Sequence, residues 1–198
     1  LRCFDNYFTI QYCFAMAERY WVQAKEKLRE NPCDGVHGYA HHQRVARNAA
    51  RIIKGEGLIG EIDVETFFTA LWWHDYSRGD SDVNHAAVTQ SMASLSACEE
   101  QIGTVLTLID SHSIDVERSR SIPEQVLFDA DKIDYVDPRR YAEGLEALKD
   151  GRMTAEQLNG YKKKRIIPYL AGAFGTLHYD TARELYRDNL AGLGEYVV

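Results

Sequence analysis

Apolar residues recur every three or four positions along almost the whole chain, which is the spacing of one face of an α-helix. No alternating run of apolar and polar residues bounded by turn-forming residues stands out, so nothing signals a β-strand. The pattern predicts an all-α fold, organised as a single-domain helical bundle. The predicted helices cover about residues 7–30, 38–54, 63–77, 83–99, 103–112, 121–135, 139–149, 154–172 and 179–191.

Several of these helices have recognisable ends. Pro32 disfavours helical geometry at the residue before it and ends the first helix. Asp63 is a typical N-cap residue for the third helix. Ser121 and Glu124, with Pro123 between them, form the pattern of a capping box, which predicts a helix start there.

The composition is that of a folded globular chain, with 45% hydrophobic and 27% charged residues among 198. Lysine and arginine total 23 against 30 acidic residues, so the net charge of -7 opposes binding to duplex nucleic acid or to an anionic membrane. The apolar stretch 8–17 is too short to span a bilayer. Four widely separated cysteines indicate reduced thiols and a cytoplasmic location, and no feature predicts a particular oligomeric state.

Histidines and aspartates lie on helix faces that should be apolar. His41, for example, shares one stripe with Val45 and Ile52, so it should point inward. His74 and Asp75 border the buried face at the end of their helix in the same way. The inward titratable positions are His41, His74, Asp75, His85, His112, Asp131 and Asp134.

Burying an unpaired carboxylate costs several kcal/mol, and lysine and arginine look scarce on these faces. We therefore expect one divalent ion to neutralise Asp75 and Asp131 and to bind the imidazoles of His41 and His74. Two nitrogen and two carboxylate ligands would leave positions for water and substrate, unlike a closed structural zinc site. Such a site suits Mn, Fe, Co, Ni or Zn, with Mg as a further option, and a second ion is conceivable.

Three segments carry these ligands in a fixed order. They are His37–Val45 with His41 in a His-x-x-Arg-Val pattern, Leu71–Arg78 with the His74-Asp75 pair, and Phe128–Asp134 with Asp131. Together they resemble the HD-domain superfamily of metal-dependent phosphohydrolases, whose signature is a histidine, a His-Asp pair and a distant aspartate. The resemblance implies an HD-type helical domain over residues 1–198, with a motif core at 37–134 and helices within 139–191 packed on it.

The resemblance also suggests roles for two further histidines. His85 and His112 are similar to the extra histidines with which some members hold a second metal ion, whereas members with one ion use histidines in this region to contact phosphate. Both roles stay open. The histidine pair that often accompanies a two-metal site is missing near His112, which favours a single ion.

Other charged residues near the motifs are candidates for substrate binding. Arg44, Arg78 and Lys132 could contact phosphate, although Arg44 could equally orient a helix through a salt bridge. Asp134 could orient a water molecule or a ligand histidine, or else form a salt bridge between helices. His42, one position off the ligand stripe, is expected at the surface or behind the ligands.

The leading hypothesis is a metal-dependent phosphohydrolase that uses a metal-activated water to cleave a phosphoester or phosphoanhydride. Its substrate would be a nucleotide or a similar small phosphorylated metabolite. Two alternatives remain: a dinuclear-iron oxygenase on the same scaffold, and a non-catalytic, metal-bound sensing module. Phosphate release, oxygen consumption, or metal-dependent folding without turnover would distinguish the three.

Overall fold

The computed structural model describes residues 18–30, 37–77, 80–112, 120–163 and 176–197. Within these ranges every regular element is a helix and none is a strand, which confirms the predicted all-α fold. The elements are α2 (Glu18–Glu30), α3 (Tyr39–Gly55), the short 3-10 helix η1 (Leu58–Gly60), α4 (Val64–Trp73), α5 (Ser81–Ser94), α6 (Glu99–Ser111), α7 (Ile122–Asp134), α8 (Pro138–Lys149), α9 (Ala155–Tyr161) and α11 (Asp180–Val197).

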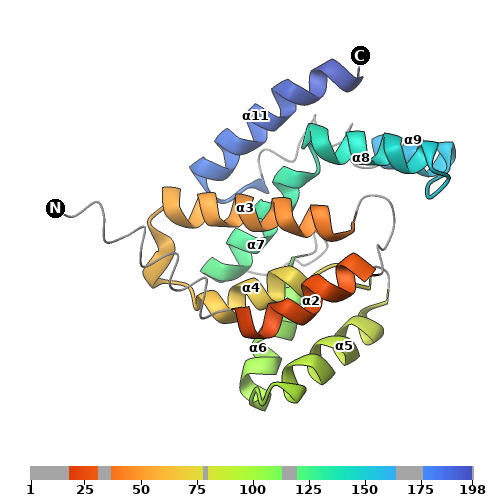
Figure 1. Cartoon of the computed structure of the whole chain (residues 1–198). Coiled ribbons are helices and arrows are strands. Elements are labelled where there is room, and N and C mark those ends of the chain that lie inside the picture. The colour runs from red at the N-terminus through yellow and green to blue at the C-terminus, as the bar shows by residue number, and fades with distance from the viewer. Residues whose placement is uncertain (1–17, 31–36, 78–79, 113–119, 164–175, 198) are drawn as a thin grey trace.

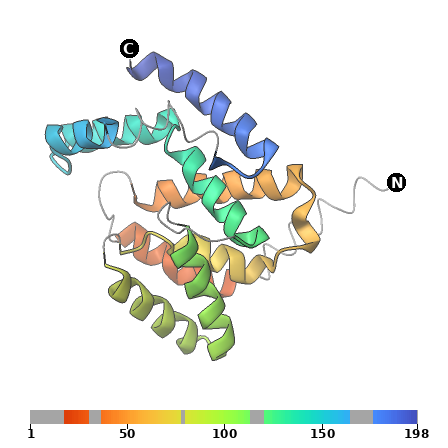
Figure 2. The same cartoon turned by 180° about the vertical axis from the view of Figure 1, so that it is seen from behind.

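The two helices α3 and α7 cross at the centre of the molecule and pack extensively against each other (Figure 1). Helices α2 and α4 lie on one side of this crossing, with α5 and α6 beyond them. Helices α8, α9 and α11 lie on the other side, as the reverse view also shows (Figure 2). Sequence-distant segments therefore meet around the crossing.

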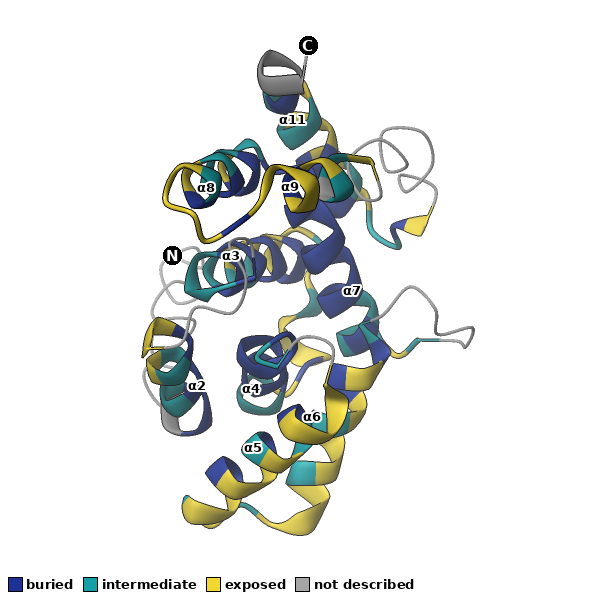
Figure 3. Cartoon of the chain, turned by 90° about the vertical axis from the view of Figure 1, so that its right-hand side faces the viewer, coloured by how far each residue is buried: buried dark blue, intermediate teal, exposed yellow. Residues whose placement is uncertain are grey.

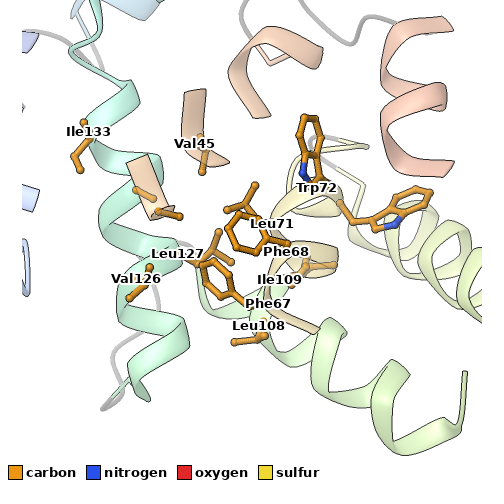
Figure 4. Close-up of a cluster of buried hydrophobic side chains, with 14 of the residues drawn as sticks. Val45, Phe67, Phe68, Leu71, Trp72, Leu108, Ile109, Val126, Leu127 and Ile133 are labelled. Carbon is orange, nitrogen blue, oxygen red and sulfur yellow. The ribbon is translucent and has the colours of Figure 1, made fainter. Parts of the chain in front are cut away.

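Helix α4 runs through the main hydrophobic core. Its residues Phe67 and Leu71 lie beside Leu127 of α7 and near Ile109 of α6, and all four are almost fully buried (Figure 4). Burying side chains of this size contributes about 2 kcal/mol each before entropy is subtracted. Colouring by burial shows α4 and α7 with little exposed surface, whereas α5 and α6 expose one side (Figure 3). Because the second half of α4 is buried on all sides, the residues that directly follow this helix also lie in the interior.

The predicted boundary between the helices at 83–99 and 103–112, which correspond to α5 and α6, is wrong. Helix α5 ends at Ser94 rather than near residue 99, and α6 begins at Glu99 rather than at 103. The chain turns through Ser96, whose φ of 66° is left-handed and incompatible with a continuing helix. Cys98 then starts α6 by donating its backbone N–H to Gln101 Oε1 at 3.1 Å. Cysteine is an unusual residue at this position, which is why the pattern gave no signal.

The C-terminal helix docks on the central helices. Helix α11 packs against α3, α7 and α8, and extends six residues beyond the predicted end at 191. The backbone N–H of Thr181 donates to Glu56 Oε1 at 2.8 Å, and the Thr181 side chain leaves no room for a side chain at Gly55. Of the predicted helix 154–172, the structure shows α9, while residues 164–175 lie outside the described ranges. No helix in the described part is long and apolar enough to cross a membrane.

Candidate metal centre

Four of the predicted ligand residues converge where α3, α4 and α7 meet. His41 comes from the first turn of α3, His74 and Asp75 directly follow α4, and Asp131 lies in the last turn of α7. One potential ligand atom from each lies within 4.8 Å of all the others. The four residues are buried, the most accessible being Asp75 at 9% exposed. These residues could therefore hold a metal ion.

The Nε2 atoms of His41 and His74 face each other, and they cannot form a hydrogen bond when both rings are neutral. His41 Nδ1 lies 2.7 Å from Asp134 Oδ2 and His74 Nδ1 lies 2.7 Å from the Leu71 carbonyl oxygen, so both Nδ1 atoms donate a proton to these acceptors. In neutral rings, both Nε2 atoms then carry lone pairs, and these atoms are only 3.2 Å apart. A positive charge between them would resolve the repulsion, which is what a metal ion supplies.

The carboxylates complete the same centre. Asp75 Oδ2 and Asp131 Oδ1 lie 3.7 and 3.6 Å from His41 Nε2, and 3.9 and 3.8 Å from His74 Nε2. Among the residues that the structure describes, Asp131 Oδ1 is buried and accepts no hydrogen bond. A buried carboxylate oxygen without a partner is costly. These distances are slightly longer than the ~3.0 to 3.4 Å that separates adjacent donor atoms at about 2.1 Å from one ion in octahedral or tetrahedral geometry.

Lys132 lies against the opposite oxygen of the same carboxylate. Its Nζ donates to Asp131 Oδ2 at 2.6 Å, and the lysine is only 2% exposed. Burial would raise the pKa of the Asp131 carboxyl, but Lys132 and the nearby His74 hold it well below its usual range. Asp131 is therefore ionised near neutral pH, with one oxygen occupied by Lys132 and one oxygen available. The predicted role of Lys132 in binding phosphate is untested, but its observed partner is Asp131.

A second group of charges supports His41 from behind. Asp134 accepts hydrogen bonds from His41 Nδ1 and from Arg140 Nη1 at 3.0 Å, and Arg44 Nε donates to it at 2.5 Å. Arg44 also bonds to Glu143. Burial would raise the pKa of Asp134, but His41 and the two guanidinium groups hold it well below its usual range. Asp134 thus contacts the candidate ligand His41 and also bridges helices, so its geometry is compatible with both sequence interpretations.

This group corrects one premise of the sequence analysis. Lysine and arginine were expected to be scarce on the inward faces, yet Arg44, Lys132 and Arg140 are each at most 3% exposed. Part of the buried negative charge is thus balanced by the protein itself. The arrangement of Arg44 favours its interpretation as a salt bridge over a phosphate contact. The negative charge that these cations do not balance lies between the four candidate ligand atoms.

The electrostatic environment also shifts the pKa values of the two candidate histidine ligands. Burial and the nearby guanidinium of Arg140 lower the pKa of His41, outweighing the opposite effect of Asp134. His41 is therefore neutral near pH 7, as a metal ligand must be. Burial alone would lower the pKa of His74, but Asp131 and Asp75 raise it. A metal ion would compete with a proton for His74.

A polar cleft of about 330 Å³ opens from the centre between α4, α5 and α6. His74 and Asp75 lie at its inner end. Its walls include Asp80, Asn84 and Asp110. This cleft gives small molecules in solvent a route to the side of Asp75, and it is where a substrate could bind.

The two additional histidines both line this cleft but differ in their contacts. His112 Nε2 lies 3.6 Å from Asp75 Oδ1, and its ring packs edge-on against His74. His85 Nε2 lies 2.8 Å from Asp110 Oδ1, in a partly exposed pair at the cleft wall. The geometry is compatible with either role that the resemblance suggested. Arg78, the third predicted phosphate contact, lies outside the described residues, so its role stays a prediction.

Three residues near the centre were missed or misplaced by the sequence analysis. His42 is fully buried with its ring 4.8 Å from that of His74, so the expectation of a surface position is wrong and a place behind the ligands is right. His37 lies against Arg140. Arg140 shares a helix face with the buried Gly144 and Ala147, the same signal of a polar residue on an apolar stripe that identified the histidines.

Comparison with known proteins gives matches in structure only. No family model and no curated protein sequence matches the chain. A protein from Lactobacillus plantarum superposes with a TM-score of 0.70 at 21% identity, over 92% of this chain and 93% of that one. An HD-superfamily hydrolase from Bacillus thuringiensis gives 0.65 at 14% identity, over 93% and 94%. Bacillus subtilis YpgQ in complex with ADP gives 0.62 at 18% identity, over 93% of each chain.

Proposed function

We propose that this chain, which has the all-α fold of the HD superfamily, is a metal-dependent phosphohydrolase acting on a nucleotide or similar small phosphorylated metabolite. The observation that carries the proposal is the convergence of His41, His74, Asp75 and Asp131 around one point. The mixed nitrogen and oxygen donors suit Mn, Fe, Co, Ni or Zn and tolerate Mg. The ADP in YpgQ supports a phosphorylated substrate for this fold, although it belongs to that protein.

The chemistry of the ion fits hydrolysis of a phosphate ester or anhydride. When bound, a divalent ion polarises a phosphoryl oxygen and acidifies a water molecule. The protein contributes by fixing the ligands before the substrate arrives. Asp134 holds the Nδ1 proton of His41, which keeps Nε2 free, and Lys132 occupies one oxygen of Asp131, which leaves the other free. The buried position of the ligands also limits the access of bulk water.

The cleft determines how a substrate would approach. Asp75 lies at the boundary between the ligand cluster and the cleft, with His112 beside its second oxygen. We infer that a phosphate enters from this side, near His112. Neither Arg44 nor Lys132 is exposed enough to meet it without moving, so we expect them to act by positioning the ligands.

The proposal is tested by measuring metal content and phosphate release on the same sample. The protein is purified without added metal, analysed for bound elements, and assayed with Mn²⁺ on p-nitrophenyl phosphate and a nucleotide panel. The Asp75→Asn variant should lose most of the bound metal and at least about a hundredfold in kcat, because a ligand and its charge are removed. The matched control is Asp82→Asn, an exposed aspartate of α5 outside the centre, which should match the wild type.

Several results would reject the proposal. These are the absence of phosphate release with any of the candidate ions, and an Asp75→Asn variant that keeps both metal and activity. Oxygen consumption by an iron-loaded sample without phosphate release would favour the dinuclear-iron oxygenase. Metal-dependent stability without turnover of any kind would favour the sensing module.

A further inference from the structure

One wall of the cleft carries a buried hydrogen-bond acceptor that receives no hydrogen bond from the described residues. Asn84 of α5 is 4% exposed and lines the cleft. Its Nδ2 donates to the Trp73 carbonyl oxygen at 3.1 Å, which fixes the orientation of the amide. Among the described residues, its Oδ1 receives no hydrogen bond. A buried acceptor left open next to a cleft is suited to a ligand that brings a donor.

The charged groups around Asn84 also favour a ligand that donates hydrogen bonds. Asp80 and Asp110 are exposed at the cleft wall, and Asp110 lies 2.8 Å from His85. Within the described part of the chain, no lysine or arginine lines the cleft. Ser77 adds a hydroxyl group. The described part of this wall, here called the outer cleft (Asp80, Asn84 and Asp110), is therefore rich in acceptors and negative charge, whereas the positive ion would lie beside His74 and Asp75.

This distribution of charge would affect polyphosphates and phosphomonoesters differently. A phosphate at the inner end is favoured by the ion. If further phosphates follow it along the cleft, they approach Asp80 and Asp110, and like charges at short range repel. If hydroxyl or amino groups follow it, they can donate to Asn84 Oδ1 and to the carboxylates.

We propose that the outer cleft, formed by Asp80, Asn84 and Asp110, binds the organic part of a phosphomonoester through its hydroxyl or amino groups and disfavours polyphosphate chains. The inference rests on the proposed function and narrows it from phosphoesters and phosphoanhydrides to monoesters. Asn84 is then a specificity-determining residue, and the two aspartates exclude additional phosphates.

The first test compares AMP with ATP, which share a nucleoside and differ in the number of phosphates. The Mn²⁺-loaded wild type should show a kcat/KM for AMP at least about tenfold above that for ATP. The double variant Asp80→Asn/Asp110→Asn removes both charges, and asparagine can still cap α5 at position 80. The ratio should fall at least about fivefold in this variant. Asp82→Asn, which removes a charge from α5 outside the cleft, should leave the ratio unchanged.

The second test addresses the unused acceptor. Asn84→Ala should lower kcat/KM for AMP about tenfold more than for phenyl phosphate, whose organic part has no hydroxyl or amino group. A thermal melt shows whether the variant is folded. An equal fall for both substrates would mean that Asn84 only supports the structure, and would overturn its assigned role.

The outcomes separate this inference from the proposed function. If ATP is hydrolysed as efficiently as AMP, or if the double variant keeps the wild-type ratio, the inference fails while the phosphohydrolase assignment stands. If no substrate releases phosphate, the proposed function fails. Calorimetric affinities for AMP and ATP then test the preference of the cleft directly, and tighter binding of ATP would overturn it.

Discussion

At the scale of single residues, the candidate centre depends on which buried charges are balanced by the protein and which are not. Asp134 contacts His41, Arg44 and Arg140, so its charge is compensated without an ion. Asp131 is compensated on one oxygen only, by Lys132. The four candidate ligand atoms thus enclose a region of negative potential that favours a cation.

The contact between Asp134 and His41 should tune metal affinity. In Asp134→Asn the side-chain shape is kept, but the carboxylate that fixes the His41 tautomer is lost. We expect metal binding to weaken about 10- to 100-fold, the usual effect of losing such a supporting group. Competition with a chromophoric chelator measures the dissociation constant. An unchanged constant would show that Asp134 has no influence on the ligand.

The low pKa of Asp134 makes the stability of the metal-free protein depend on pH. Because the folded pKa lies below the unfolded value of about 3.9, this carboxylate stabilises the fold fully above that value, and the stabilisation is lost progressively as the pH falls from about 3.9 towards the folded pKa. Acid should therefore destabilise the wild type more steeply than Asp134→Asn, by up to about 1.4 kcal/mol per pH unit. Urea unfolding in chelator between pH 7 and 3 measures both slopes. Parallel curves would contradict the prediction.

At the scale of elements, α4 delivers two candidate ligands to the interior because its second half is buried on every side. All of its residues from Phe67 to Trp73 are buried, so the chain emerging at its end must place His74 and Asp75 inside the molecule. Its start is polar and exposed. There Asp63 accepts hydrogen bonds from Glu65 N at 3.2 Å and Thr66 Oγ1 at 2.6 Å.

We therefore predict that the exposed start of α4 affects the stability of the protein but not its catalytic activity. Asp63→Ala removes the N-cap and should lower the free energy of unfolding by about 1 kcal/mol. Asp63→Asn, which can still accept the hydrogen bond from Glu65 N, is the matched control and should cost much less. Denaturant unfolding measures both, and phosphate release should be unchanged. A loss of activity in the alanine variant at a temperature where it is folded would contradict this view.

The boundary between α5 and α6 shows where element-level prediction failed. The residues before the turn are as compatible with a helix as those within α5, and only Ser96 with its left-handed backbone marks the break. This turn decides how α5 and α6 pair, and with them the shape of the cleft wall that carries His85 and Asp110.

At the scale of the whole molecule, the centre joins three helices that are distant in sequence. A ligand that binds only the folded state adds stability according to its concentration relative to its dissociation constant. We expect Mn²⁺ at 100 times that constant to stabilise the protein by about 2.7 kcal/mol and chelator to reverse the effect. Thermal melts with and without the ion measure the shift. The Asp131→Asn variant should show little Mn²⁺-dependent rise in melting temperature. A rise equal to that of the wild type would mean that the ion binds elsewhere.

The sequence by itself determined the helical class of the protein and the residues at its candidate centre. Helical periodicity is local, so apolar spacing was enough to predict most elements. Polar side chains such as His41 and Asp131 were recognisable because a titratable group on an apolar stripe must be buried with a partner. The resemblance to the HD superfamily came from the same residues, and the structural matches agree with it in fold.

Only the tertiary structure decided which partners compensate these groups and where a substrate can enter. Asp134 meets His41 across 93 positions of sequence, and His37 meets Arg140 across 103. Such contacts depend on how whole helices pack, which local spacing does not encode. The open acceptor on Asn84 likewise exists only because α5 lies against the end of α4, where the Trp73 carbonyl oxygen holds one side of the amide and leaves the other free.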